Sequence, residues 1–156
     1  MKRLTANMFN DDWALVTAGT KDNFNTMTIS WGGMGTLWSK PVVTIYIRPN
    51  RYTYEFIENN DYFVISFFDN KYKKDLGILG SKSGRDGDKL ALTSLTPEIL
   101  DYGVTYQQAN KTLVCKKIYH QDLKLEDIPE TAIKNYYKDE PVHRMYIGEV
   151  VEIIEK

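Results

Sequence analysis

Three groups of hydroxyl and basic side chains have the types and spacing needed to hold a ligand. In the first, Thr26, Thr28 and Ser30 alternate along an extended segment and therefore share one side of it. Hydroxyls in such a row can hydrogen-bond a polyhydroxyl chain or the carbonyl groups of a ring. The same alternation is typical of an ordinary solvated sheet face, so both interpretations stay open.

The second group lies where an extended segment gives way to a helix. It combines two guanidinium groups, hydroxyls and the free amides of a helix N-terminus, a combination that indicates a phosphate site. Its members are Arg48, Arg51, Tyr52 and Thr53. For Arg48 a second interpretation stays open, because an arginine there can also close the mouth of a barrel by pairing with a carboxylate.

The third group is the polar segment 81–89, SKSGRDGDK, which we predict to be a loop. Its glycines allow backbone amides to approach an anion, and its hydroxyls and cations add further donors. The segment from Ser81 to Lys89 is thus a second candidate anion-binding region. An ordinary mobile surface loop would have the same composition.

The sequence lacks the motifs of the common side-chain catalysts and nucleotide loops: HExxH, GxSxG, the Walker loop and GxGxxG. The glycine pattern at 31–35, WGGMG, predicts a tight turn or a close backbone approach. His120 and His143 have no carboxylate at metal-ligand spacing, and Cys115 lies in an apolar stretch that favours an inert core thiol. An enzyme of this kind would need a cofactor to carry the reactive atoms.

Composition sets limits on the partners and the compartment. The chain has 156 residues, with 20 basic and 21 acidic side chains, so no global field would attract nucleic acid or an anionic membrane. We predict one domain over residues 1–156. A single cysteine suits a reducing compartment, and no apolar run reaches about 18 residues, so we expect a soluble, cytoplasmic protein.

The predicted elements are mainly strands that lie close together without βαβ spacing. This pattern favours a mostly antiparallel barrel with a few short helices. In 42–48, alternation separates buried Val43, Ile45 and Ile47 from the opposite face, and 62–68 is apolar on both faces and therefore central. Strands are expected at 14–19, 25–31, 42–48, 62–68, 112–121 and 144–154, and helical segments at 51–60, 71–80, 89–95 and 129–138.

Several of these segments together resemble the flavin reductase-like family. The segments are NTMTISWGGMGTLWSKPVVTIYIRPNRYTYEFI, YFVISFF, DLGILGSKSGRDGDK and HRMYIGEVVEI, which run from about Ala14 to Glu152 in the family's order. The resemblance implies a Greek-key split β-barrel and a homodimer with FMN near the subunit interface. It also implies two-electron exchange between NADH or NADPH and flavin or a redox protein partner.

Residue roles follow from the same resemblance. The NxMTIS match implies contacts with the flavin ring and ribityl chain by Asn25, Met27, Thr28, Ile29 and Ser30. The RPxRYT match implies phosphate or ribityl contacts by Arg48, Arg51, Tyr52 and Thr53. The loop match implies further anchors at Ser81, Lys82, Ser83 and Arg85, and it assigns Asp86 and Lys89 less firmly. Trp31 and Trp38 are expected to shield the ring.

The resemblance also implies a nicotinamide contact for His143, and here the sequence departs from the family's pattern. The next residue, Arg144, is charged where an apolar one is usual. A plain role at the start of a strand therefore stays open for His143.

The leading functional hypothesis is an FMN-dependent NAD(P)H:flavin oxidoreductase. Two alternatives remain. One is an FMN-containing electron carrier, flavoredoxin-like, that a protein partner reduces. The other is a non-catalytic barrel that binds a ligand or a partner.

Overall fold

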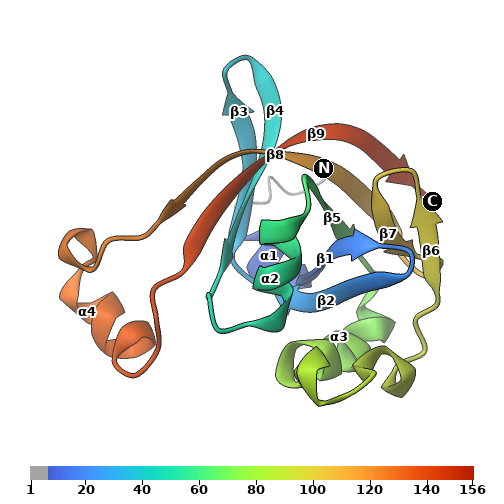
Figure 1. Cartoon of the computed structure of the whole chain (residues 1–156), viewed down its shortest axis with the longest axis horizontal. Coiled ribbons are helices and arrows are strands. Elements are labelled where there is room, and N and C mark those ends of the chain that lie inside the picture. Colours follow the sequence, from blue (N-terminus) through green and yellow to red (C-terminus); the bar gives the residue numbers. More distant parts are fainter. Residues whose placement is uncertain (1–6) are drawn as a thin grey trace.

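The computed structural model describes residues 7–156, and one curled antiparallel sheet dominates it (Figure 1). Its seven strands run in the order β2-β1-β5-β8-β9-β4-β3, so β1 lies beside β5 and β4 beside β9, as Greek-key connections require. The mainly β, antiparallel fold predicted from the sequence is confirmed. The strands are β1 (Ala14–Thr20), β2 (Asn23–Ile29), β3 (Gly32–Leu37), β4 (Lys40–Ile47), β5 (Tyr62–Phe67), β8 (Lys111–Asp122) and β9 (Arg144–Glu155).

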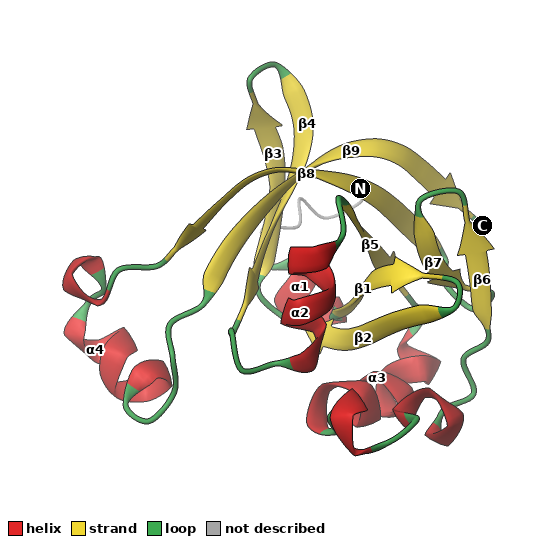
Figure 2. Ribbon diagram, viewed as in Figure 1, coloured by secondary structure: helices red, strands yellow, loops and turns green. Residues whose placement is uncertain are grey.

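Short helices and a small second sheet surround this barrel (Figure 2). The second sheet pairs β6 (Pro97–Leu100) with β7 (Gly103–Tyr106). The helices are α1 (Met8–Asp12), α2 (Tyr52–Asn59), α3 (Lys73–Ser81) and α4 (Glu130–Ala132). Short 3₁₀ turns lie at Asn70–Tyr72, Gly84–Asp86, Lys89–Leu92 and Leu125–Asp127, and a π-helical turn at Ile133–Tyr137 follows α4.

The hydrophobic core forms on both faces of β1 because its residues Ala14–Ala18 are buried on either side. One cluster fills the barrel and includes Val16, Ile45 and Phe63; the other lies between β1, α3 and β7 and includes Leu79. The predicted alternation in β4 and the central position of β5 are both confirmed. A strand apolar on both faces is buried on both faces.

Three short strands were not predicted. The glycine pattern at 31–35 predicts a tight turn or a close backbone approach; Gly32–Leu37 form β3, and a Cβ added to Gly32 would lie 2.8 Å from Thr44 O. The turn itself follows at Trp38 and Ser39, which both have positive φ. Such a two-residue turn matches the twist of a hairpin. Glycine contributes no side-chain pattern, so the period of two is invisible in β3. In β6 and β7, four residues each are too few to show a period.

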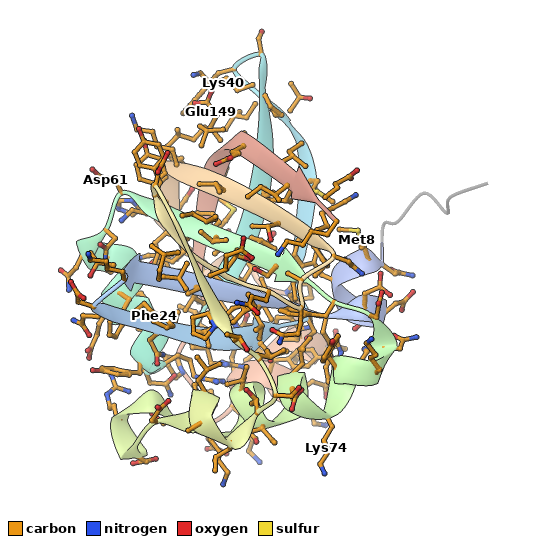
Figure 3. All side chains as sticks on the ribbon, turned by 90° about the vertical axis from the view of Figure 1, so that its right-hand side faces the viewer. Met8, Phe24, Lys40, Asp61, Lys74 and Glu149 are labelled. Atoms are coloured by element: carbon orange, nitrogen blue, oxygen red, sulfur yellow. The ribbon has the colours of Figure 1, made fainter. Side chains whose placement is uncertain are left out.

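Two long excursions extend from the barrel. The β3–β4 hairpin projects at one end, where Lys40 and Glu149 lie, and α3 with Lys74 covers the opposite end (Figure 3). The β8–β9 ribbon carries α4 and the π-helical turn away from the barrel (Figure 1). The predicted helix at 129–138 therefore exists, but it changes from α to π geometry after Ala132.

Candidate functional site

A cavity of about 270 Å³ lies where β2, the beginning of α2 and the end of α3 meet. It is lined by Asn25 and Met27 of β2 and by Asn50 and Arg51 of the connection between β4 and α2. The other side is formed by 80–84, the end of α3 with the residues that follow it, and by Lys89. Three segments that are far apart in the sequence thus share one small polar hollow.

Two cations are fixed at this cavity by the carboxyl end of α3. Arg51 Nη2 donates to Gly80 O at 2.9 Å, and Lys89 Nζ donates to Leu79 O at 2.9 Å and to Lys82 O at 3.0 Å. Helix C-termini attract positive charge, so these bonds are favourable. Burial, with the nearby Arg51 charge, lowers the pKa of Lys89 to about 8, and burial also lowers the pKa of Arg51.

The N-terminus of α2 adds unused amide donors to the same cavity. Its N-cap is Arg51, and no side chain of the described residues caps the helix. Thr53, in the first turn, is buried and accepts a hydrogen bond from Asn25 Nδ2 at 2.8 Å, which ties α2 to β2. Free helix amides beside two cations form a donor set suited to a phosphate monoester.

The structure brings eight of the residues predicted for the cofactor site to this cavity. They come from three of the matched segments and lie along its wall. They are Asn25, Met27, Arg51, Tyr52, Thr53, Ser81, Lys82 and Ser83.

Two hydroxyls of the row on β2 are bonded to protein, and Thr26 is buried, so this part of the row is not a solvated sheet face. Thr26 Oγ1 donates to Val16 O at 3.1 Å, and Thr28 Oγ1 donates to Leu76 O of α3. Ile29 belongs to the barrel core. Ser30 and Trp31 follow β2, and neither lines the cavity described above.

Arg48 lies in a different contact set, away from the lining of this cavity. Its guanidinium donates to Pro141 O at 2.8 Å and to Tyr136 O at 2.9 Å, and its Cζ is 5.1 Å from the ring centre of Tyr137. Arg48 therefore fixes the segment between α4 and β9, which contains both carbonyl groups. Neither of the interpretations that were open, a phosphate ligand or a partner of a carboxylate, describes these contacts.

His143 lies in the same contact set as Arg48. Its Nδ1 is 2.8 Å from Tyr137 Oη, and its ring centre is 5.1 Å from that of Trp31. Burial and the Arg48 charge lower the pKa of His143 to about 4, so the ring is neutral at pH 7. Exposed Tyr136 meets Trp31 edge to face at 5.0 Å. A neutral imidazole thus lies within a mainly aromatic patch.

Arg85 also points elsewhere, because it is paired with Glu55 on α2. Sequence reasoning missed Asn50 and Gly80 as parts of the cavity wall, and it gave Lys89 too little weight. Gly84, which also lines the cavity, is one of the two glycines that marked SKSGRDGDK as a place of close backbone approach.

Other kinds of site receive no support from residues 7–156. In this part of the chain no group of three or more His, Cys, Asp or Glu side chains could hold a metal ion. No described helix has the length and apolar character to span a bilayer. Cys115 on β8 is buried, as predicted, and burial raises its pKa to about 12. Such a thiol is a poor nucleophile.

Comparisons with known proteins agree with this architecture. The sequence model of the family described as "Flavin reductase like domain" matches residues 7–156. The flavoredoxin of Desulfovibrio vulgaris (Miyazaki F) is 22% identical, with a TM-score of 0.73 over 100% of this chain and 76% of that chain. A putative flavin reductase with a split barrel domain from Shewanella frigidimarina is 20% identical, with a TM-score of 0.74 over 100% and 75% of the two chains.

A third similar structure is an FMN-binding protein from Thermus thermophilus with bound p-hydroxybenzaldehyde. It is 20% identical, with a TM-score of 0.71 over 93% of this chain and 71% of that chain. A comparison with curated proteins gave no match. The fold is accordingly a split β-barrel, as the sequence led us to expect.

Proposed function

Because this chain belongs to the flavin reductase like domain family, we propose that it is an FMN-dependent oxidoreductase that passes hydride from NADH or NADPH to flavin. The cavity between β2, α2 and α3 carries the proposal. It combines a guanidinium, an ammonium, hydroxyls and free helix amides in about 270 Å³. This donor set suits the terminal phosphate of FMN, and it sits beside the strand whose sequence matches the family's ring-binding segment.

In this proposal Arg51 and Lys89 bind the phosphate of FMN through hydrogen bonds and charge. Each side chain is already fixed by carbonyl groups of α3, so little side-chain entropy is lost when an anion binds between them. A guanidinium offers a planar fork of donors and an ammonium a compact charge. Ser81 and Ser83 complete the wall with hydroxyls.

The ring is proposed to lie along β2. This strand is at the edge of the sheet and pairs with β1, so backbone groups on its other edge have no ladder partner among the described strands. Unpaired amides of an edge strand are ready donors, and amides aimed at ring carbonyls would stabilise negative charge there. The match with the family assigns this contact to Asn25 through Ser30.

When bound, FMN supplies the redox chemistry, because its ring accepts a hydride from a reduced nicotinamide. The chain's residues orient the reactants and exclude water. Trp31 and His143 lie in contact with each other, and the imidazole carries no charge at pH 7. We propose that this patch offers aromatic side chains and a neutral imidazole to the nicotinamide.

The purified protein tests this function directly. We expect quenching of FMN fluorescence on titration and oxidation of NADH or NADPH in the presence of FMN or FAD. A protein that leaves FMN fluorescence unchanged would contradict flavin binding. Oxidation of neither dinucleotide by a flavin-binding protein would contradict only the hydride donor.

An FMN-containing electron carrier is the second candidate, since the fold is also shared with a flavoredoxin. The sequence at position 144 supports this candidate, because Arg144 stands where the family usually has an apolar residue, and the match to the family's nicotinamide segment is incomplete there. The carrier would take electrons from a protein partner. It would therefore bind FMN and show no turnover with NADH or NADPH.

We also propose that the protein works as a homodimer in the cytoplasm. On β3, a Cβ added to Gly33 or Gly35 would meet nothing within 4 Å, so packing within the described chain does not require these glycines. Glycine in a strand often marks the close approach of another backbone. Light scattering of the purified protein gives its mass, and a monomeric mass would contradict the dimer.

A further inference from the structure

Arg85 connects the residues after α3 to the beginning of α2. Its Nη2 donates to Glu55 Oε1 at 2.7 Å, and its Nη1 donates to Asn50 O at 3.1 Å. Its Cζ is 4.9 Å from the ring centre of Tyr52. Arg85 does not line the cavity. Its side-chain contacts join the segment that follows α3 to residues at the beginning of α2.

Residues 81–88, which include Arg85, are called the 81–88 loop here. This loop forms one wall of the cavity and contacts the opposite wall, which β2 and α2 form. A Cβ on Gly84 would lie 2.2 Å from Asn25 Oδ1 and 3.0 Å from Tyr52 Cδ2. The loop backbone therefore touches two residues of the opposite wall directly. Beyond the loop, Lys89 is fixed to α3. The loop is thus held at one end by Lys89 and at its middle by Arg85.

We propose that Arg85 and Glu55 form a clasp that holds the 81–88 loop closed over the phosphate and sets how fast flavin leaves. A phosphate in this cavity would have the loop on one side, so opening of the loop would remove part of its donor set and speed the departure of the flavin. Glu55, which no sequence pattern singled out, becomes a determinant of flavin retention. The inference rests on the flavin binding proposed above.

The clasp and a direct phosphate contact by Arg85 predict opposite effects of neutralising Glu55. If Arg85 binds the phosphate, Glu55→Gln frees the guanidinium for that role, and FMN leaves more slowly. If Arg85 and Glu55 are a clasp, Glu55→Gln loosens the loop, and FMN leaves faster. Both side chains are partly exposed, so we expect an acceleration of about two- to fivefold.

The test uses the whole chain, as wild type and as Glu55→Gln. FMN release is measured from the return of flavin fluorescence when the loaded protein is diluted. Hydrogen exchange of the 81–88 amides is measured separately on flavin-free protein. The clasp predicts faster release and faster exchange in Glu55→Gln. Unchanged or slower release overturns it, and so does unchanged exchange across the loop.

Glu98→Gln is the matched control, because it breaks an ion pair of similar exposure, between Glu98 on β6 and Lys156. It should leave both measurements at wild-type values, and an equal acceleration in this variant would overturn the assignment to Glu55. If wild type binds no FMN, the proposed function fails. The exchange comparison on flavin-free protein still decides whether Glu55 holds the loop.

Discussion

Arg51 and Lys89 bind neighbouring carbonyl groups at the end of α3, Gly80 O and Leu79 O, each at 2.9 Å. The helix end favours both cations, yet burial, together with the charge of Arg51, lowers the pKa of Lys89. An anion between the two would relieve their repulsion. This pair is the reason that we propose an anion as the ligand of this cavity.

The pH dependence of flavin affinity should identify Lys89 as a phosphate ligand. Its pKa is about 8, so it loses charge as the pH rises above that value, while the phosphate, with a second pKa of about 6, stays a dianion. FMN affinity should fall from about pH 8 upward, by about ten- to thirtyfold at pH 9.5, because one proton with a pKa of about 8 is involved, and riboflavin affinity should not fall. Fluorescence titrations at pH 7 and pH 9.5 measure both.

Lys89→Met should remove the difference between the two pH values and bind FMN weakly at both. Riboflavin serves as the internal reference, because it lacks the phosphate. A parallel fall of FMN and riboflavin affinity with pH would count against this role of Lys89.

Arg51 and Arg48 should differ in their effect on FMN. Arg51 lines the cavity, so Arg51→Gln should weaken FMN about tenfold or more and riboflavin little. Arg48 binds Pro141 O and Tyr136 O, so Arg48→Gln should affect both flavins equally and speed hydrogen exchange in 129–141. Selective loss of FMN binding in Arg48→Gln would instead support the phosphate contact implied by the family resemblance.

Alanine substitutions of two glycines should have different effects, one on stability and one on FMN affinity. Gly77 is exposed on α3 with open space around an added Cβ, so Gly77→Ala should stabilise the protein by about 0.5 to 1 kcal/mol. Gly84→Ala should weaken FMN, because Asn25 is buried and bonded to Thr53 and cannot easily turn away. Thermal unfolding and FMN titration of both variants measure the effects. Wild-type FMN affinity in Gly84→Ala would contradict the close contact.

Arg144 should carry part of the stability that is lost in acid. It donates to Asp122 at 2.7 Å and to Glu58 at 2.9 Å, and Glu58 also accepts from Tyr146. Its hydrogen bond lowers the pKa of Asp122. Burial alone would raise the pKa of Glu58, but the bonds from Tyr146 and Arg144 bring it below its usual value.

A lowered carboxyl pKa stabilises the fold above the ordinary value, and this contribution disappears as the pH falls through the folded-state pKa. Arg144→Met should therefore cost about 1 to 2 kcal/mol at pH 7 and less at pH 3, as urea unfolding at the two values would measure. Lys116→Met, which removes an exposed cation from β8, is the control. An equal loss at both values would mean that Arg144 contributes packing rather than charge.

The fold was largely predictable because its strands carry a strong hydrophobic period. Val43, Ile45 and Ile47 mark one buried face, and the apolar run 62–68 marks the centre of the sheet. The strand at 32–37 could not be found in this way, because its glycines leave no pattern to follow.

The sequence predicted the segments of the candidate site and eight of the residues that line it, but not the contacts of every long side chain. The sequence identified the three regions that meet at the cavity. It could not tell that Arg48 and Arg85 reach away from it, because long side chains can bind any carbonyl or carboxylate within reach of their flexible stems. The alternation on β2 placed Thr26 and Thr28 on one face but did not reveal that α3 and β7 would cover it.

Because Cys115 is buried, the rate at which its thiol is alkylated in the native protein reports how often the barrel opens. An alkylating reagent cannot reach this sulfur while β8 is paired with β5 and β9, and the thiol is almost entirely protonated at neutral pH. The rate of alkylation would therefore follow how often these strands separate. Any small molecule that favours the closed barrel would slow the labelling, which offers a ligand screen that needs neither colour nor turnover.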